Sequence, residues 1–282
     1  MKKIRILTDS SSDFCPPYPE NLTILPMTIH FGNEDYQDNV TISHRDFYEK
    51  LEACADLPTT SLIAPGAFEA VFDKAAADGE TVIALTISSK LSGTYQSACL
   101  AADGREDVFV IDSLNATLGL QILVQYALQL VQRGLPAEAI VEELERSKSR
   151  IHVLGLPATL EYLKRGGRIS KTVAIVGEAL SIKPVLALSE GEIIVLGKAR
   201  GSKNGNNFLV KEIEKSNGVC FTMPYCLGYT GLSEELLNRY IEDSRQLWEG
   251  KTDRLPISTV GATIGTHVGP GAILIAYFDN NF

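Results

Sequence analysis

The sequence contains no apolar segment long enough to span a membrane. No stretch approaches the roughly eighteen consecutive apolar residues that a membrane-spanning helix needs. The first residues, Met1–Arg5, run straight into a strand-like segment, and this stretch is too short to be a signal peptide. From the sequence we therefore expect a cytoplasmic protein with no stable membrane insertion.

Cysteine is scarce and is not arranged for disulfides or metal binding. The five cysteines are odd in number, and none belongs to a Cys-x-x-Cys pair. Disulfide frameworks and structural zinc sites both need cysteines at defined spacings, so we expect reduced thiols. No second histidine or cysteine lies at metal-ligand spacing from His267, and we expect no bound metal. The cysteines are Cys15, Cys54, Cys99, Cys220 and Cys226.

Positive charge is also in short supply. The 26 Lys and Arg residues stand against 35 Asp and Glu, which gives a net charge of −9. Nucleic-acid binding depends on clustered cations that neutralise phosphates, so we expect no nucleic-acid partner. The exception is the run from Lys164 to Lys171, where four cations fall within eight residues. Such a run is usually a solvated face, and it can also dock an acidic or phosphate-bearing partner.

The chain divides into two halves of different texture. With 282 residues it is long for one compact core, and we expect domains at residues 1–150 and 151–282. In the first half, strands alternate with helices, which favours an α/β domain with a parallel sheet covered on both faces. The second half has a hairpin and later separate strands, which favours an α+β domain with a mostly antiparallel sheet.

The patterns of apolar residues give the expected elements. We expect strands at 4–8, 22–29 with a break at Pro26, 81–87, 108–112, 151–155, 184–188, 192–196, 218–223 and 272–278. We expect helices at 44–51 with Ser43 as N-cap, and at 65–76, 95–102, 119–131, 136–148 and 158–165. Residues 31–36, 58–61 and 201–207 are expected to form turns or loops.

The stretch Ser88–Ala98 is the most informative part of the sequence. It joins a β-branched strand to a helix through a turn rich in hydroxyl groups. In open α/β sheets ligands bind at such strand ends, and the free N–H groups of a helix start favour an anion. Ser92 and Thr94 add neutral donors, and Gly93 permits close approach. The alternative is that these residues only cap their own helix.

Two further segments carry candidate groups. His267 lies among Gly261, Gly265, Gly269 and Gly271, and it can donate a hydrogen bond near neutral pH. A lone histidine is more often structural, so both readings stay open. The segment Asp9–Asp13 resembles an aspartyl phosphatase loop, but Ser11 occupies the place of the second carboxylate. Capping and turn formation explain this segment better.

Together these motifs resemble the DegV family of bacterial fatty-acid-binding proteins, over essentially the whole chain. One departure is visible: the family often has Gln-Pro-Ser after its Thr-Ser pair, where this chain has Leu62–Pro65. The segments that carry the resemblance are Thr8–Ser11, Thr60–Ser61, Leu91–Ala98, Asp112–Ser113, Leu163–Ile169, Lys183–Pro184, Arg200–Gly201 and Gly265–Gly271.

The resemblance implies that a long-chain fatty acid is held between the two domains. By analogy with the family, its carboxylate would be bound by residues from two loops and by one late histidine, while the acyl chain lies in an apolar tunnel. Burying about fifteen methylenes contributes on the order of 12 kcal/mol before ordering costs, which is ample for tight binding. The implied headgroup residues are Thr60, Ser61, Ser92, Gly93, Thr94 and His267.

The resemblance also implies a partner. Family members present the carboxyl group to a separate ATP-dependent fatty acid kinase, which makes the acyl phosphate for phospholipid synthesis. Arg168 and Arg200 would then lie near the exposed end, available to the kinase or to the phosphate. On this reading the protein is a carrier with no catalytic residues and no cofactor.

Two alternatives stay open at this point. One is an acyl hydrolase with Ser92 as nucleophile and His267 as base, although no Gly-x-Ser-x-Gly elbow is present. The other is a regulatory or scaffolding protein with the same fold and an empty crevice.

Overall fold

The computed structural model describes residues 2–169 and 182–281, so Ser170 and Lys171 of the basic run lie outside the described residues. A four-stranded parallel sheet, in the order β2-β1-β6-β7, forms the N-terminal core. The strand β6 is buried along its whole length, as its β-branched residues predict. The four strands are β1 (Ile4–Asp9), β2 (Leu22–Leu25), β6 (Thr81–Thr86) and β7 (Val108–Asp112).

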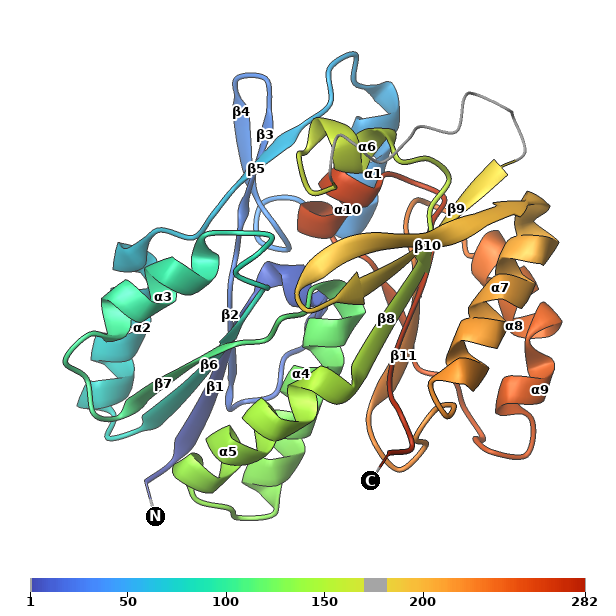
Figure 1. Cartoon of the computed structure of the whole chain (residues 1–282). Helices are drawn as coiled ribbons and strands as arrows, with labels where there is room; N and C mark the ends of the chain where they lie inside the picture. The colour runs from blue at the N-terminus through green and yellow to red at the C-terminus, as the bar shows by residue number, and fades with distance from the viewer. Residues whose placement is uncertain (1, 170–181, 282) are drawn as a thin grey trace.

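Helices cover both faces of the parallel sheet, as the alternation of strands and helices predicts. On one face lie α2 (Pro65–Ala77) and α3 (Thr94–Ala102); on the other lie α4 (Thr117–Gln132) and α5 (Ala137–Ser147). Figure 1 shows α4 directed between this sheet and the second one. Because α4 packs on both sheets, most of its residues are buried, and the helix is apolar nearly all round.

The second sheet has the order β10-β9-β8-β13-β11-β12. It is antiparallel except for the pairing of β11 with β12, so the predicted fold class is confirmed. Three helices cover its outer face: α7 (Gly201–Lys215), α8 (Glu235–Asp243) and α9 (Arg245–Trp248). The strands are β8 (Ile151–Leu156), β9 (Ile182–Ser189), β10 (Glu192–Arg200), β11 (Tyr225–Tyr229), β12 (Ile257–Thr259) and β13 (Ile273–Phe278).

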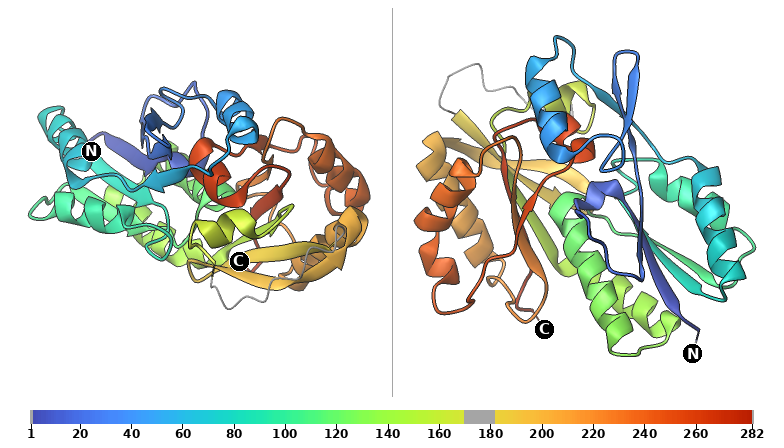
Figure 2. Two further views of the ribbon diagram at one scale, coloured as in Figure 1. Left: turned by 90° about the horizontal axis from the view of Figure 1, so that it is seen from above. Right: turned by 180° about the vertical axis from the view of Figure 1, so that it is seen from behind.

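A small third sheet brings an early and a late segment of the chain together. It has the order β4-β3-β5, and helices α1 and α10 pack beside it, although α10 comes from the end of the sequence (Figure 2). The boundary near residue 150 stays a prediction. The elements here are β3 (Thr28–Phe31), β4 (Glu34–Gln37), β5 (Thr59–Ser61), α1 (His44–Ala53) and α10 (Ala262–Val268); the short pieces η1 (Ser10–Ser12), η2 (Lys148–Arg150) and α6 (Glu161–Arg165) complete the described elements.

Several boundary predictions are confirmed. Pro26 separates β2 from β3, and the two strands join different sheets. Ser43 caps α1, where its hydroxyl accepts from the backbone N–H of Asp46 at 3.1 Å. The hairpin of β9 and β10 forms as expected, with Glu190 and Gly191 at its turn. Within residues 2–169 and 182–281, no helix combines the length and the apolar character that crossing a membrane requires.

Five local predictions are wrong. Residues 59–61 are a strand because β3 supplies their hydrogen-bond partners, which no local pattern reveals. Residues 34–36 also belong to a strand, and the turn is confined to Gly32 and Asn33. Residues 201–207 begin α7, where the bare Gly205 lets the helix pack on Leu156. The strand expected at 218–223 starts instead at Tyr225, and α6 begins at Glu161 rather than at 158.

Candidate functional site

A pocket of about 560 Å³ lies between the parallel sheet and the antiparallel sheet. Most of its wall is apolar. One side comes from strands of the antiparallel sheet, and the other comes from loops that follow β2 and β6, so neither half of the chain forms the pocket alone. Its volume falls within the range of about 300–1,000 Å³ that is usual for small-molecule sites. The apolar wall includes Met27, Ile87, Leu91, Val153, Leu163, Leu186, Leu188, Ile193, Ile264, Val268, Ile273 and Leu274.

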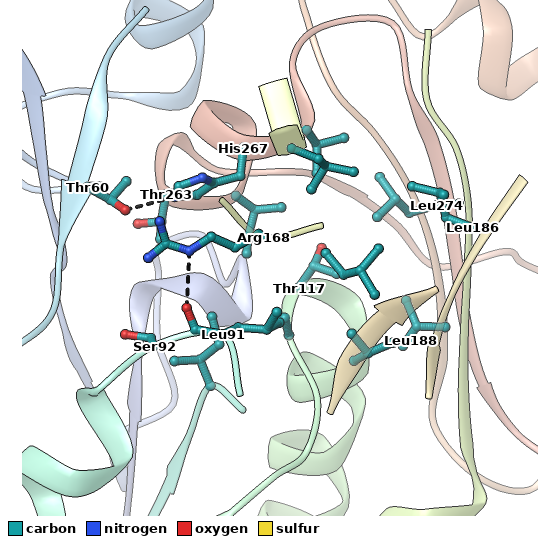
Figure 3. Close-up of a pocket in the computed structure, with 18 of the residues that line it drawn as sticks. Thr60, Leu91, Ser92, Thr117, Arg168, Leu186, Leu188, Thr263, His267 and Leu274 are labelled. Carbon is teal, nitrogen blue, oxygen red and sulfur yellow. Dashed lines mark hydrogen bonds between the residues drawn. The ribbon is translucent and has the colours of Figure 1, made fainter. Parts of the chain in front are cut away.

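The polar groups gather at one end of this pocket. Figure 3 shows Thr60, His267, Arg168 and Ser92 on one side, opposite the leucines of the second sheet. The Oγ1 of Thr60 and the Nε2 of His267 form a hydrogen bond of 2.8 Å, although the residues are 207 positions apart. Thr60 comes from β5 and His267 from α10, so the packing of α10 on the small sheet creates this pair.

His267 is neutral at physiological pH. Burial, with the nearby Arg168 charge, lowers the pKa of His267 from 6.5 to about 4. Its second ring nitrogen, Nδ1, is buried without a partner among the described residues. Gly166 lies against this nitrogen, since a Cβ on Gly166 would come within 2.3 Å of it. The glycine that ends α6 therefore also makes room for the imidazole.

Arg168 lies in the pocket itself. Its Nε donates to the carbonyl of Leu91 at 3.2 Å, and one terminal nitrogen donates to the carbonyl of Gly166 at 2.6 Å (Figure 3). No carboxylate within the part of the chain that the structure describes pairs with this guanidinium. Burial lowers the pKa of Arg168, and the group still carries its charge at neutral pH because arginine titrates so high. Among residues 2–169 and 182–281, the site thus holds a fixed cation with no carboxylate partner.

The turn that precedes α3 reaches the pocket through Ser92 and Gly93. Thr94 does not line the pocket; its hydroxyl lies 2.9 Å from that of Ser92, and it accepts from the N–H of Ile63 at 3.4 Å. Thr94 thereby orients Ser92. A Cβ on Gly93 would come within 2.9 Å of the Leu62 side chain, so this glycine accommodates Leu62.

The other predicted site residues lie at the edge of the pocket or outside it. Ser61 and Leu62 are the exposed residues among those that line the pocket, which places its mouth beside them. Arg200 is exposed at the end of β10, and it does not line the pocket.

Two threonines of the site, Thr117 and Thr263, were missed by the sequence reasoning. Both are buried and line the pocket, and each is bonded to a buried aspartate. The hydroxyl of Thr117 donates to Asp13 at 2.5 Å, and that of Thr263 donates to Asp38 at 2.6 Å. Neither threonine lies in a motif that signals a ligand, and only their tertiary placement brings them to the pocket.

The two aspartates attach the start of α10 to the N-terminal half. Asp38 accepts from the N–H groups of Ala262 at 3.2 Å and of Thr263 at 2.9 Å, and Asp13 accepts from the N–H of Gly261 at 2.8 Å. Burial raises the pKa of Asp13 well above its usual range. These bonds satisfy the free N–H groups at the start of the helix that carries His267.

The geometry does not favour the hydrolase alternative. The Oγ of Ser92 is bonded to Thr94, and the Nε2 of His267 is bonded to Thr60. A nucleophile and its base must share a hydrogen bond, and these two residues have none between them in the described structure.

Comparison with known proteins fits this architecture. The model of the DegV family, described as an uncharacterised protein family, matches residues 3–280. The chain belongs to the DegV family. A DegV domain-containing protein of Caldanaerobacter subterraneus is 36% identical over 281 residues, with 96% of this chain and 97% of that protein covered. The resemblance drawn from the motifs is confirmed.

Solved structures share the whole fold. One that reports the fatty acid binding of a DegV family protein from Thermus thermophilus matches with a TM-score of 0.85 and 33% identity, covering 98% of this chain and 99% of that one. The fatty acid kinase B3 protein of Streptococcus pneumoniae, solved loaded with linoleic acid, matches with a TM-score of 0.86 at 24% identity, covering 99% and 100%. At that identity the second match indicates a shared fold.

The low pKa of His267 predicts a specific loss of stability in acid. The folded imidazole titrates at about 4 and the unfolded one at 6.5, so the unfolded chain binds the extra proton between these values. The contribution of His267 to the free energy of unfolding is therefore fully present above pH 6.5, and about 2 kcal/mol of it is lost at pH 5. In urea unfolding, the wild type should lose about 2 kcal/mol more between pH 7 and pH 5 than His267→Gln loses. Identical pH dependence in both proteins would contradict the assignment.

The contact between Gly166 and His267 predicts that Gly166→Ala is harmful. The added methyl group would overlap Nδ1 of His267, and overpacking of this kind costs about 1–3 kcal/mol. We expect a lower midpoint in urea and weaker ligand binding, because His267 must move away from Thr60. Gly66→Ala is the matched control, since its Cβ would meet open space within a helix. Equal stability of the two variants would argue against the contact.

Proposed function

We propose that this protein binds a long-chain fatty acid in the pocket and presents its carboxyl group to a separate ATP-dependent kinase for acyl-phosphate formation. The observation that carries the proposal is the Arg168 cation, which pairs with no carboxylate of the described residues and lies beside the Thr60–His267 pair at the polar end of an otherwise apolar pocket. A cation, hydroxyl groups and a long apolar wall fit an amphiphile with one anionic end.

The apolar wall supplies the affinity. Each buried methylene contributes about 0.8 kcal/mol, so a chain of about fifteen methylenes gives on the order of 12 kcal/mol before the costs of ordering. That surplus supports tight binding with few polar contacts. The fatty acid binding reported for the Thermus thermophilus protein and the linoleic acid loaded into the Streptococcus pneumoniae protein agree with a ligand of this class.

The polar end supplies the specificity for an acid. With its proton on Nε2, the neutral His267 donates to Thr60, which leaves the hydroxyl hydrogen of Thr60 free to donate to a carboxylate oxygen. Arg168 provides the opposite charge, and its bonds to the two backbone carbonyls hold it in place. Ser92 lies on the same side and adds a further hydroxyl.

The kinase step is supported by the position of the mouth. Ser61 and Leu62 are exposed beside Thr60, so the headgroup end of the pocket opens toward solvent. Arg168 at this end can also neutralise a phosphoryl group as it is added. The structural likeness to the Streptococcus pneumoniae fatty acid kinase B3 protein points the same way. We also assign Arg200, which is exposed at the end of β10, to the surface that faces the kinase.

The binding proposal is tested by extraction of the purified protein with organic solvent, followed by mass spectrometry. We expect a co-purifying long-chain acid, or uptake of an added one. The absence of both would overturn the proposal.

Arg168→Gln tests the headgroup contact. A hydrogen bond to a charged group is worth about 1.5–3 kcal/mol, so we expect the affinity for hexadecanoic acid to fall by roughly 10–100-fold. Binding of the methyl ester, which has no charge, should hardly change. Arg165→Gln is the matched control, because Arg165 is exposed and paired with Glu161 at 2.8 Å. Equal losses for acid and ester would contradict the charge contact.

The position of Gly155 in the pocket predicts how substitutions there change the longest acyl chain that the protein binds. It lies in β8 between Leu274 and Leu186, it lines the pocket, and a Cβ there would meet only the Ile273 carbonyl, at 3.9 Å. A side chain at this position therefore fills the pocket rather than the protein core. Gly155→Val adds three carbons, so we expect the longest acid bound to shorten by about three carbons, with Gly155→Ala between. A competition series from twelve to eighteen carbons measures this. If the preferred acid lengths are the same in the wild type and in both variants, the acyl chain does not lie beside Gly155.

A further inference from the structure

The outer part of the small sheet contains a Ser–His–Asp hydrogen-bond chain. The Nε2 of His30 lies 2.6 Å from the Oγ of Ser61, and its Nδ1 lies 2.6 Å from a carboxylate oxygen of Asp35. The three residues come from the adjacent strands β5, β3 and β4. This order and these distances are those of an activated serine, in which the carboxylate orients the imidazole and the imidazole takes the hydroxyl proton.

The position of Ser61 connects this chain to the pocket. Ser61 follows Thr60 directly and is the last residue of β5, and it is one of the two exposed residues that line the pocket. Side chains alternate along a strand, so Thr60 turns to His267 while Ser61 turns to His30. Ser61 therefore lies at the rim of the pocket, one residue from the Thr60 hydroxyl.

We propose that Ser61 is a site of covalent self-acylation, which takes the acyl group from an acyl phosphate that reaches the mouth of the pocket. The proposal rests on the proposed function, because that function supplies the acyl phosphate. The modified serine would carry its acyl chain at the rim, next to the Thr60 headgroup contact, and would obstruct the exchange of free acid.

The step is balanced as a simple acyl transfer. The Oγ of Ser61 attacks the carbonyl carbon of the mixed anhydride while the Nε2 of His30 takes the hydroxyl proton. The bond between the carbonyl carbon and the phosphate oxygen breaks, and His30 returns the proton to the departing phosphate. The products are an ester on Ser61 and inorganic phosphate, with no oxidation or reduction.

The test is intact-protein mass spectrometry with peptide mapping, after incubation of the full chain with hexadecanoyl phosphate and, separately, with a hexadecyl fluorophosphonate. We expect one adduct, on Ser61, that is absent in Ser61→Ala. Positioned general-base catalysis contributes about 10²–10⁴-fold, so His30→Asn should slow the reaction at least a hundredfold, and Asp35→Asn should slow it less. Thr59→Ala, on the same strand and the same face, is the matched control and should react at the wild-type rate.

The outcomes separate this inference from the binding proposal. Uptake of hexadecanoic acid without any adduct overturns the role of Ser61 alone, and the chain of hydrogen bonds is then only a tie between three strands. An adduct that forms equally fast in His30→Asn, or that falls on Ser92, also overturns it. If the protein takes up no fatty acid, both proposals fail.

Discussion

The hydrogen bond between Thr60 and His267 is the interaction on which the site depends. It joins a three-residue strand of the N-terminal half to the last helix of the chain, at the polar end of the pocket. The pairing of β5 with β3 holds Thr60 in place, and the docking of α10 holds His267. Asp38 and Asp13 fix that docking through the first N–H groups of α10. The geometry of the proposed headgroup site therefore depends on tertiary contacts between distant parts of the chain.

The pocket exists because both large sheets pack against α4, which leaves a space between the sheets beside the start of this helix. α4 is packed against both sheets, and the space beside its first turn is lined from both sides. Glycines shape this space. Gly155 places no side chain in the pocket from the second sheet, while Gly93 and Gly166 leave room for the side chains of Leu62 and His267. An apolar cavity of this size is costly to leave empty, which fits a protein that is stabilised by an apolar ligand.

Sequence reasoning reached the parts of the fold that rest on local chemistry. The strand, turn and helix around Ser92, the capping of α1 by Ser43 and the hairpin at Gly191 follow from apolar spacing and turn residues. The motifs shared with the DegV family led to Thr60 and His267, whose types alone were ambiguous. The pairing of these two residues in space was not visible, because their separation of 207 positions has no local signature.

The failures have the same physical origin. Three residues of β5 read as a loop because their strand character comes from β3, and Gly201–Asn207 read as a loop because weak helix formers are held there by packing on Leu156. Thr117 and Thr263 gave no signal, since a buried threonine bonded to an aspartate looks like any other structural threonine. Gly93 and Gly166 make room for neighbouring side chains, and the sequence alone does not show which side chains these are.

A crystal structure of the protein with hexadecanoic acid is the decisive measurement for the proposed site. We predict that the carboxylate lies within hydrogen-bond distance of the Thr60 hydroxyl and of the Arg168 guanidinium, with the acyl chain running between Leu186, Leu188 and Leu274. A carboxylate at the leucine-lined end, or an acid bound outside the pocket, would contradict it.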